Sequence, residues 1–264
     1  MPSAISSSNR LLPDGSQLRN RLLAALPAAD YDRLLPYLRM RAVTTGATLQ
    51  AHRVKVKDVY FPNGGVYSIT NQMRDGALVE VATVGHEGML GIGVFFGDRA
   101  GMGRTFQQVA DGYLPSMAVA RFVTETAAPG PFRDVVNRYA QANLLQIMQC
   151  TTCNALHNVT QRSCRWLLQT HDRVDDDDFA LKQEFLAVML GVRRPTVSVV
   201  LKALQREGLI STRVRPHPHP AAQAARSDVV RMLRDDSRAL HPSRIVSHVP
   251  STYPSWWTVT SNTW

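Results

Sequence analysis

The chain has 264 residues, 44% of them apolar, so it is long enough for one large domain or two modest domains with buried cores. Its formal net charge of +9 favours a polyanionic partner. No stretch approaches the ~18 uninterrupted apolar residues of a membrane span, and the N-terminal segment MPSAISSSNR lacks the apolar core of a signal peptide. We therefore expect a cytoplasmic protein without membrane contact.

The N-terminal part predicts a lead-in followed by two short helices. Residues 1–17 are rich in Ser, Pro and Gly, and we expect them to be disordered. Residues 18–38 carry leucines at helical spacing, and Pro27 divides this segment. We interpret the two halves as packing helices that carry no chemistry.

A β-type pattern covers residues 40–122. Short alternating runs are separated by turn signals such as Asn63-Gly64 and Asp111-Gly112. This rhythm is typical of an antiparallel sandwich or roll. We predict a jelly-roll-like β-roll domain over residues 18–130.

Helical spacing returns after Pro131. Apolar residues follow at three- and four-residue steps as far as Leu156, which predicts one long helix over 131–156. A further helix over Thr160–His171 carries Trp166 and should pack beneath the elements that follow it. The acidic run 175–178 is interpreted as a solvated loop.

The stretch LKQEFLAVMLGVRRPTVSVVLKALQREGLI predicts two helices around a tight turn at Gly191. Pro195 suits the first turn of the second helix, which ends at Gly208. Its buried face is expected to contain Val197, Val200, Leu201 and Leu204. Two amphipathic helices around a glycine also occur in proteins that never bind DNA, so this spacing alone leaves the function open.

Charge favours DNA binding by this stretch. From Leu181 to Arg215 there are seven Lys or Arg and two Glu, and phosphate contacts require such an excess. Two short helices with a basic, amide-bearing outer face on the second are suited to the major groove. The predicted DNA-binding residues are Arg193, Arg194, Thr196, Ser198, Val199, Lys202 and Gln205.

The segment GVRRPTVSVVLKALQREGLI resembles the recognition helix of the Crp/Fnr family of bacterial transcription regulators, and QEFLAVMLG resembles the helix before it. YFPNGGVYSI is similar to part of the family's β-roll. The resemblance covers about residues 20 to 212 and implies an α+β fold. It implies a β-roll of the cyclic-nucleotide-binding type, a dimerisation helix over 131–156 and a winged helix-turn-helix domain over 157–212. The apolar stripe of 131–156 can also pack on its own β-roll.

The resemblance also indicates where an effector would bind. In cyclic-nucleotide-binding members, a Gly-Glu pair and a downstream Arg-Ser or Arg-Thr pair hold the ribose and the phosphate. Here Gly91 matches the glycine, but Ile92 stands where the glutamate is expected, and Arg104 with Thr105 can supply the second pair. An isoleucine cannot accept a hydrogen bond from ribose, so we expect no ordinary cyclic AMP binding. A different anionic ligand, or a pocket without one, remains open.

No cofactor or metal is expected. The N-terminal cysteine cluster that holds an iron–sulfur centre in the oxygen-sensing branch is missing, and Cys150 and Cys153 lie on a predicted helix without a second pair. We interpret them as buried small hydrophobic residues. No G-x-S-x-G, P-loop or H-E-x-x-H motif is present, which argues against an enzyme.

The family pattern stops after Thr212. Residues 213–264 contain seven Arg and no Lys, and Pro216, Pro218 and Pro220 argue against a regular hairpin. We therefore expect the wing to be missing or replaced and residues 213–264 to form an atypical, disordered tail. A short helix within 224–240 is the exception.

The sequence as a whole predicts a homodimeric regulator of the Crp/Fnr type that binds a palindromic site in double-stranded DNA. Its β-roll senses, or once sensed, a small molecule, and RNA polymerase is a candidate partner. The alternative is a ligand-binding or interaction module that has lost DNA binding because its wing has been replaced.

Overall fold

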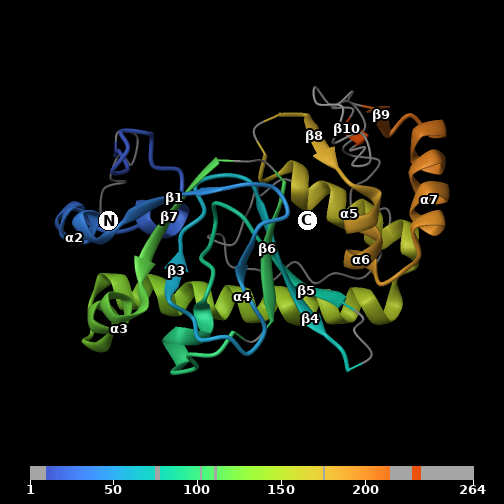
Figure 1. Ribbon diagram of the computed structural model, residues 1–264. Helices are drawn as coiled ribbons and strands as arrows, with labels where there is room; N and C mark the ends of the chain where they lie inside the picture. The colour runs from blue at the N-terminus through green and yellow to red at the C-terminus, as the bar shows by residue number, and fades with distance from the viewer. Residues whose placement is uncertain are drawn as a thin grey trace, which may run out of the picture. The chain divides into compact units, whose positions relative to one another are not determined.

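The computed structural model describes residues 10–74, 78–101, 103–109, 112–174, 176–214 and 228–232 (Figure 1). Contacts divide the chain into two compact units. The first combines Met1–Gln72 with Ala82–Ile147, and the second combines Met73–Val81 with Met148–Trp264. The border therefore crosses one strand and one long helix rather than a linker.

The first unit contains two short N-terminal helices separated by Pro27, as the sequence predicts. Helix α1 spans Arg21–Ala24, α2 spans Ala28–Leu34, and a 3-10 turn follows at Leu35–Tyr37. Asn20 caps α1 by accepting a hydrogen bond from the Leu23 N–H. Its side-chain amide also donates to the carbonyl groups of Pro62 and Gly88, at 2.8 Å each. This fully buried side chain thus ties α1 to two loops of the β-roll.

The prediction that residues 1–17 are disordered is wrong for residues 10–17. The Leu12 N–H bonds to the Ser16 carbonyl at 2.8 Å, and the Leu12 side chain is buried in the core. Arg10 donates from Nη1 to the Leu26 carbonyl at 2.8 Å. Burial of the Leu12 side chain and the hydrogen bond from Arg10 to a carbonyl group after α1 therefore order this segment, although its composition is typical of a loop. Residues 1–9 lie outside the described residues.

The predicted antiparallel β-roll is confirmed. One sheet has the order β1-β7-β3 and the other has the order β2-β6-β4-β5. The strands are β1 Arg39–Val43, β2 Thr48–Gln50, β3 Asp58–Tyr60, β4 Val66–Gln72, β5 Leu78–Val84, β6 Arg104–Val109 and β7 Gly112–Ala118. The 3-10 helix η2, Ile92–Phe96, and helix α3, Val119–Ala127, complete this part of the fold.

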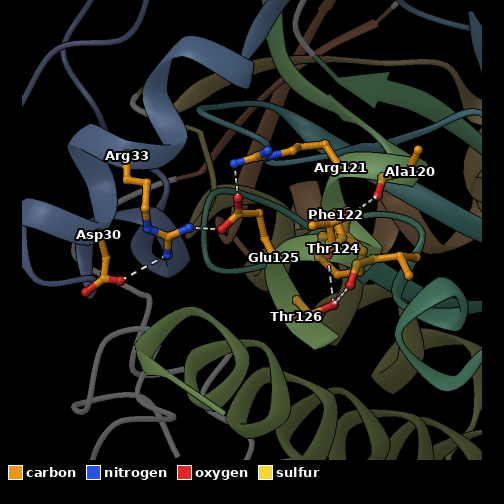
Figure 2. Close-up of polar contacts among 9 residues, drawn as sticks. Asp30, Arg33, Ala120, Arg121, Phe122, Thr124, Glu125 and Thr126 are labelled. Carbon is orange, nitrogen blue, oxygen red and sulfur yellow. Dashed lines mark hydrogen bonds and ion pairs between the residues drawn. The ribbon is translucent and has the colours of Figure 1, made fainter. Parts of the chain in front are cut away.

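The N-terminal helices are attached to α3 by a buried carboxylate (Figure 2). Only 5% of the Glu125 side chain is exposed, and it forms ion pairs with Arg33 of α2 and Arg121 of α3. Arg33 also pairs with Asp30 at 3.1 Å, and the Arg121 guanidinium lies 3.6 Å from the centre of the Tyr37 ring. Two cations thus satisfy one buried anion and join sequence-distant helices.

Helix α4 spans Pro131–Leu156, as the long-helix prediction requires. In its N-terminal part, Phe132 is buried and packs against the rings of Phe61 and Phe122. Tyr139 donates its hydroxyl to the Met89 carbonyl at 3.0 Å, and a Cβ at Gly88 would collide with the Tyr139 ring. This end of α4 therefore belongs to the core of the β-roll unit.

In the part of the chain that the structure describes, the second unit adds α5, three strands and two further helices to the end of α4 and residues 78–81 of β5. Their bounds are α5 Val159–His171, β8 Asp178–Leu181, α6 Gln183–Leu190, α7 Arg194–Arg206, β9 Ile210–Val214 and β10 Asp228–Met232. Trp166 and Leu167 of α5 are buried. Arg162 of α5 donates from Nη1 to the Leu190 carbonyl at 3.0 Å, so α5 packs against the end of α6 as predicted.

The region after Thr212 differs from its sequence prediction. Strand β9 runs to Val214 and pairs with β10, which in turn pairs with β8, so the sheet order is β8-β10-β9. The expected disordered tail is therefore wrong for residues 213–214 and 228–232. The short helix expected within 224–240 is also wrong where the structure describes it. Residues 215–227 and 233–264, including the three prolines, lie outside the described residues.

Packing explains why residues 228–232 form a strand. Val230 is fully buried and Met232 is 5% exposed, whereas Arg231 between them is exposed. This alternation is the period of a half-buried strand. Arg231 also pairs with Asp178 of β8 through Nε at 3.0 Å. The expectation that the wing is missing is wrong, because residues 228–232 supply a strand that pairs with β9.

We expect Val230→Ala to destabilise the second unit by about 1.5–3 kcal/mol, because it removes buried methyl groups from the central strand of a small sheet. Val229→Ala is the matched control, since its side chain is only half-buried and should cost less than about 1 kcal/mol. Urea denaturation followed by circular dichroism measures both. Equal effects of the two substitutions would contradict a packed β10.

Candidate nucleic-acid interface and effector site

The turn between α6 and α7 is built on Gly191, whose φ of 62° lies in the left-handed region. The Val192 N–H bonds back to the Ala187 carbonyl at 3.0 Å, and the Gly191 N–H bonds to the Val188 carbonyl at 3.1 Å. This pair of bonds closes α6, and glycine adopts the required backbone without a Cβ penalty. The chain can therefore reverse direction within three residues and begin α7 at Arg194.

The two helices bury one apolar core. Leu186, Met189 and Leu190 of α6 are buried. The predicted inner face of α7 is buried as well, and it contains Val197, Val200, Leu201 and Leu204. At the start of α6, Lys182 makes no side-chain capping bond, as expected for a residue without an acceptor. Burial of the inner face leaves the opposite side of α7 for contact with another molecule.

That opposite side carries the predicted DNA-binding residues (α7, the orange helix in Figure 1). The side chains of five of them are exposed: Arg193, Arg194, Thr196, Val199 and Lys202. The other two are half-buried and already bonded within the unit. Ser198 donates from Oγ to Gln183 Oε1 at 2.6 Å, and Gln205 donates from Nε2 to Thr212 Oγ1. The outer face of α7 is therefore basic at the helix start. Further along the helix, hydrogen bonds hold the side chains of Ser198 and Gln205 in place.

Glu184 of α6 lies beside this face of α7, and the sequence pattern does not predict it. Its Oε1 lies 3.1 Å from Nε of Arg194. The two residues belong to different helices, so no periodic spacing connects them, and only the angle between α6 and α7 brings them together. Gln183 and Thr212 were missed for the same reason.

The interpretation of residues 175–178 as a solvated loop is wrong for Asp177 and Asp178, which make tertiary contacts, whereas Asp175 lies outside the described residues. Asp177 Oδ1 lies 2.9 Å from Nε2 of His171, and its backbone carbonyl accepts a bond from the Met232 N–H at 3.0 Å. Asp178 pairs with Arg231. The Asp177 carbonyl and the Asp178 carboxylate thus attach β10 to the start of β8, and the Asp177 carboxylate contacts α5.

The effector residues proposed from sequence lie beside β2 of the first unit. Gly91 precedes η2, and Arg104 and Thr105 begin β6, which pairs with β2. Gly91 has φ 87°, and a Cβ added to it would lie 2.8 Å from the Gln50 amide nitrogen. Ile92 is buried at 7% exposure, so it adds to the core instead of offering an acceptor. Arg104 is exposed and donates from Nε to Thr48 Oγ1 at 3.1 Å.

Thr105 does not join Arg104 on one surface. It is 2% exposed and lies opposite Ile69 in the β4–β6 pair. Successive strand residues point to opposite faces of a sheet, so Arg104 and Thr105 face different sides. The structure thus leaves Arg104 exposed without Thr105 beside it on the same surface.

All three cysteines are buried free thiols. Burial raises the pKa of Cys164 to about 11. Burial also raises the pKa of Cys150, although Arg165, which donates to its Sγ at 2.9 Å, opposes the shift. Among the described residues no group of three or more His, Cys, Asp or Glu side chains is placed to hold a metal ion. None of the described helices has the length and apolar character needed to cross a membrane.

Comparison with known proteins identifies the second unit. The Crp-like helix-turn-helix domain matches residues 161–217, which include most of α5 and all of β8, α6, α7 and β9. The chain carries a Crp-like helix-turn-helix domain. No curated protein sequence matches the chain.

Solved structures extend the likeness to most of the chain. A Crp/Fnr transcriptional regulator from Eubacterium rectale has a TM-score of 0.60 at 13% identity, covering 84% of this chain and 98% of its own. A CRP-family regulator from Thermus thermophilus has a TM-score of 0.59 at 18% identity, with coverage of 80% and 97%. The c-di-GMP-responsive regulator CLP of Xanthomonas campestris gives 0.56 at 19% identity, with coverage of 71% and 96%. At these identities the likeness concerns the fold, and the chain has the fold of the Crp/Fnr regulators.

We expect the chain not to bind cyclic AMP at micromolar concentration, because Ile92 is an apolar core residue where a ribose acceptor is needed. Isothermal titration calorimetry measures the affinity directly. Micromolar binding that is lost in Arg104→Ala would contradict this expectation and would restore the cyclic-nucleotide site.

Proposed function

We propose that the protein is a DNA-binding transcriptional regulator of the Crp/Fnr type. The observation that carries the proposal is the exposed, basic N-terminal half of α7, held over a buried apolar face and a tight turn. In helix-turn-helix proteins the second helix enters the major groove and its N-terminal residues contact base edges. Arg193 and Arg194 occupy that position here.

The β-strand pair that follows α7 supports the same function. In this unit β9 and β10 form an antiparallel pair beside α7, and Arg213 of β9 is exposed. An exposed cation on such a pair is suited to a phosphate oxygen. The alternative of a module without DNA binding depended on replacement of the wing, and an antiparallel pair that presents an exposed cation beside α7 removes that reason for it.

A homodimer through α4 is part of the proposal. In the C-terminal half of the helix, Leu144 is 59% exposed, Met148 is 58% exposed and Leu156 is 76% exposed. A run of exposed apolar side chains of this kind marks an association surface. A two-fold dimer would present two copies of α7 to the two halves of a palindrome. Sedimentation at micromolar concentration that shows only monomer would contradict this assembly.

The remaining assignments follow from the proposed role. The β-roll is a sensor domain whose effector is unknown or lost. RNA polymerase is a candidate partner, the location is the cytoplasm, and no enzymatic activity is assigned. The regulator CLP of Xanthomonas campestris is c-di-GMP-responsive, which makes a cyclic dinucleotide one ligand to assay.

Arg194 and Lys202 should contribute differently to DNA binding. Arg194→Ala should weaken binding to a preferred duplex by roughly 1–3 kcal/mol and relax one base position, because arginine reads guanine O6 and N7 bidentately. Lys202→Ala should weaken all duplexes about equally and reduce the salt dependence by about one ion, because a lysine two turns along meets phosphate. Fluorescence anisotropy on preferred and random duplexes across a salt series separates the two effects.

Arg133→Ala is the matched control for this comparison. Arg133 is an exposed arginine at the start of α4 in the first unit, and its removal should change neither affinity. Equal losses on preferred and random duplexes for both Arg193→Ala and Arg194→Ala would refute base reading by these two residues.

A further inference from the structure

The start of α6 places a carboxylate beside Arg194, one of the two arginines that the proposed function assigns to base reading. Glu184 Oε1 lies 3.1 Å from Nε of Arg194 in an ion pair, and both side chains remain open to solvent, with 53% of Glu184 and 63% of Arg194 exposed. The contact uses the inner nitrogen of the guanidinium. The outer nitrogens, Nη1 and Nη2, are left for another molecule.

The position of this carboxylate is fixed by the contacts around it. Gln183, the preceding residue, accepts a hydrogen bond from Ser198, which lies one turn after Arg194 on α7. Leu186 of α6 and Leu201 of α7 are both buried, and the two helices are in contact. The backbones that carry Glu184 and Arg194 therefore cannot move apart without breaking a hydrogen bond and opening the core of the unit.

We propose that Glu184 is a positioning residue that raises sequence specificity while lowering affinity for DNA. It restrains Arg194 so that the outer nitrogens form the fork that a guanine edge accepts, which reduces the rotamer freedom lost on binding. It also brings a negative charge close to the phosphates, which lowers affinity for every duplex alike. This inference rests on the proposed function, because it requires α7 to read DNA.

The two effects predict an unusual combination of changes for Glu184→Gln. Affinity for a random duplex should rise about twofold, because one repulsive charge is removed. The ratio of specific to random affinity should fall about three- to tenfold, because an unrestrained Arg194 loses part of the discrimination of a bidentate contact. If Glu184 only stabilises the first turn of α6, Glu184→Gln would lower both affinities together and leave their ratio unchanged.

The test begins with a preferred duplex that the wild-type protein selects from a random pool and a scrambled duplex of the same composition. Anisotropy on both duplexes is measured for Glu184→Gln, Arg194→Ala and the double variant. Glu207→Gln is the matched control, because Glu207 is an exposed acid at the other end of α7. This substitution should raise both affinities without changing their ratio. In the Arg194→Ala background, Glu184→Gln should leave the ratio unchanged, because the residue that it restrains is gone.

The outcomes separate this inference from the proposed function. A ratio that falls in Glu184→Gln but not in Glu207→Gln, with no further fall in the double variant, supports it. A preserved ratio in Glu184→Gln overturns the inference and leaves the proposed function intact. A fall of equal size with Arg194 absent also overturns it. A wild-type protein that selects no sequence overturns the proposed function, and this inference with it.

Discussion

Burial of the apolar face of α7 is the constraint on which the candidate interface depends. Val197, Val200, Leu201 and Leu204 are each less than a tenth exposed. Burying side chains of this size stabilises the unit by about 1.5–3 kcal/mol each, so the helix cannot rotate about its axis without losing several of them. The remaining residues of α7 must therefore face outward. Because Arg194 and Lys202 are eight residues apart, they lie on the same outer side.

The same constraint explains what the sequence predicts well. Apolar spacing defines the inner face of α7, and the outer face follows by exclusion, so the exposed residues could be named from the sequence alone. Short alternating runs between turn signals likewise predict the antiparallel roll. In both regions the periodicity of burial coincides with the period of one element, so local pattern and tertiary packing agree.

Contacts between elements that are distant in sequence could not be predicted. Strand β10 lies among Ala, Arg and Leu residues that favour a helix, and it becomes a strand because Val230 and Met232 fill a sheet that β8 and β9 leave incomplete. The ion pair of Glu184 with Arg194 and that of Asp178 with Arg231 depend on how elements pack. Residues 10–17 are ordered because Leu12 enters a core formed by later parts of the chain. In the effector region, a linear motif placed Arg104 and Thr105 together, but strand alternation separates their side chains.

The central claim is that two copies of α7 read a duplex with two-fold symmetry. Selection of bound sequences from a random pool of double-stranded DNA by the full chain tests it most directly. The account predicts enrichment of an inverted repeat whose half-sites are centred about one helical turn, or roughly 10 base pairs, apart. Recovery of sequences no different from the starting pool, or of a motif without two-fold symmetry, would contradict it.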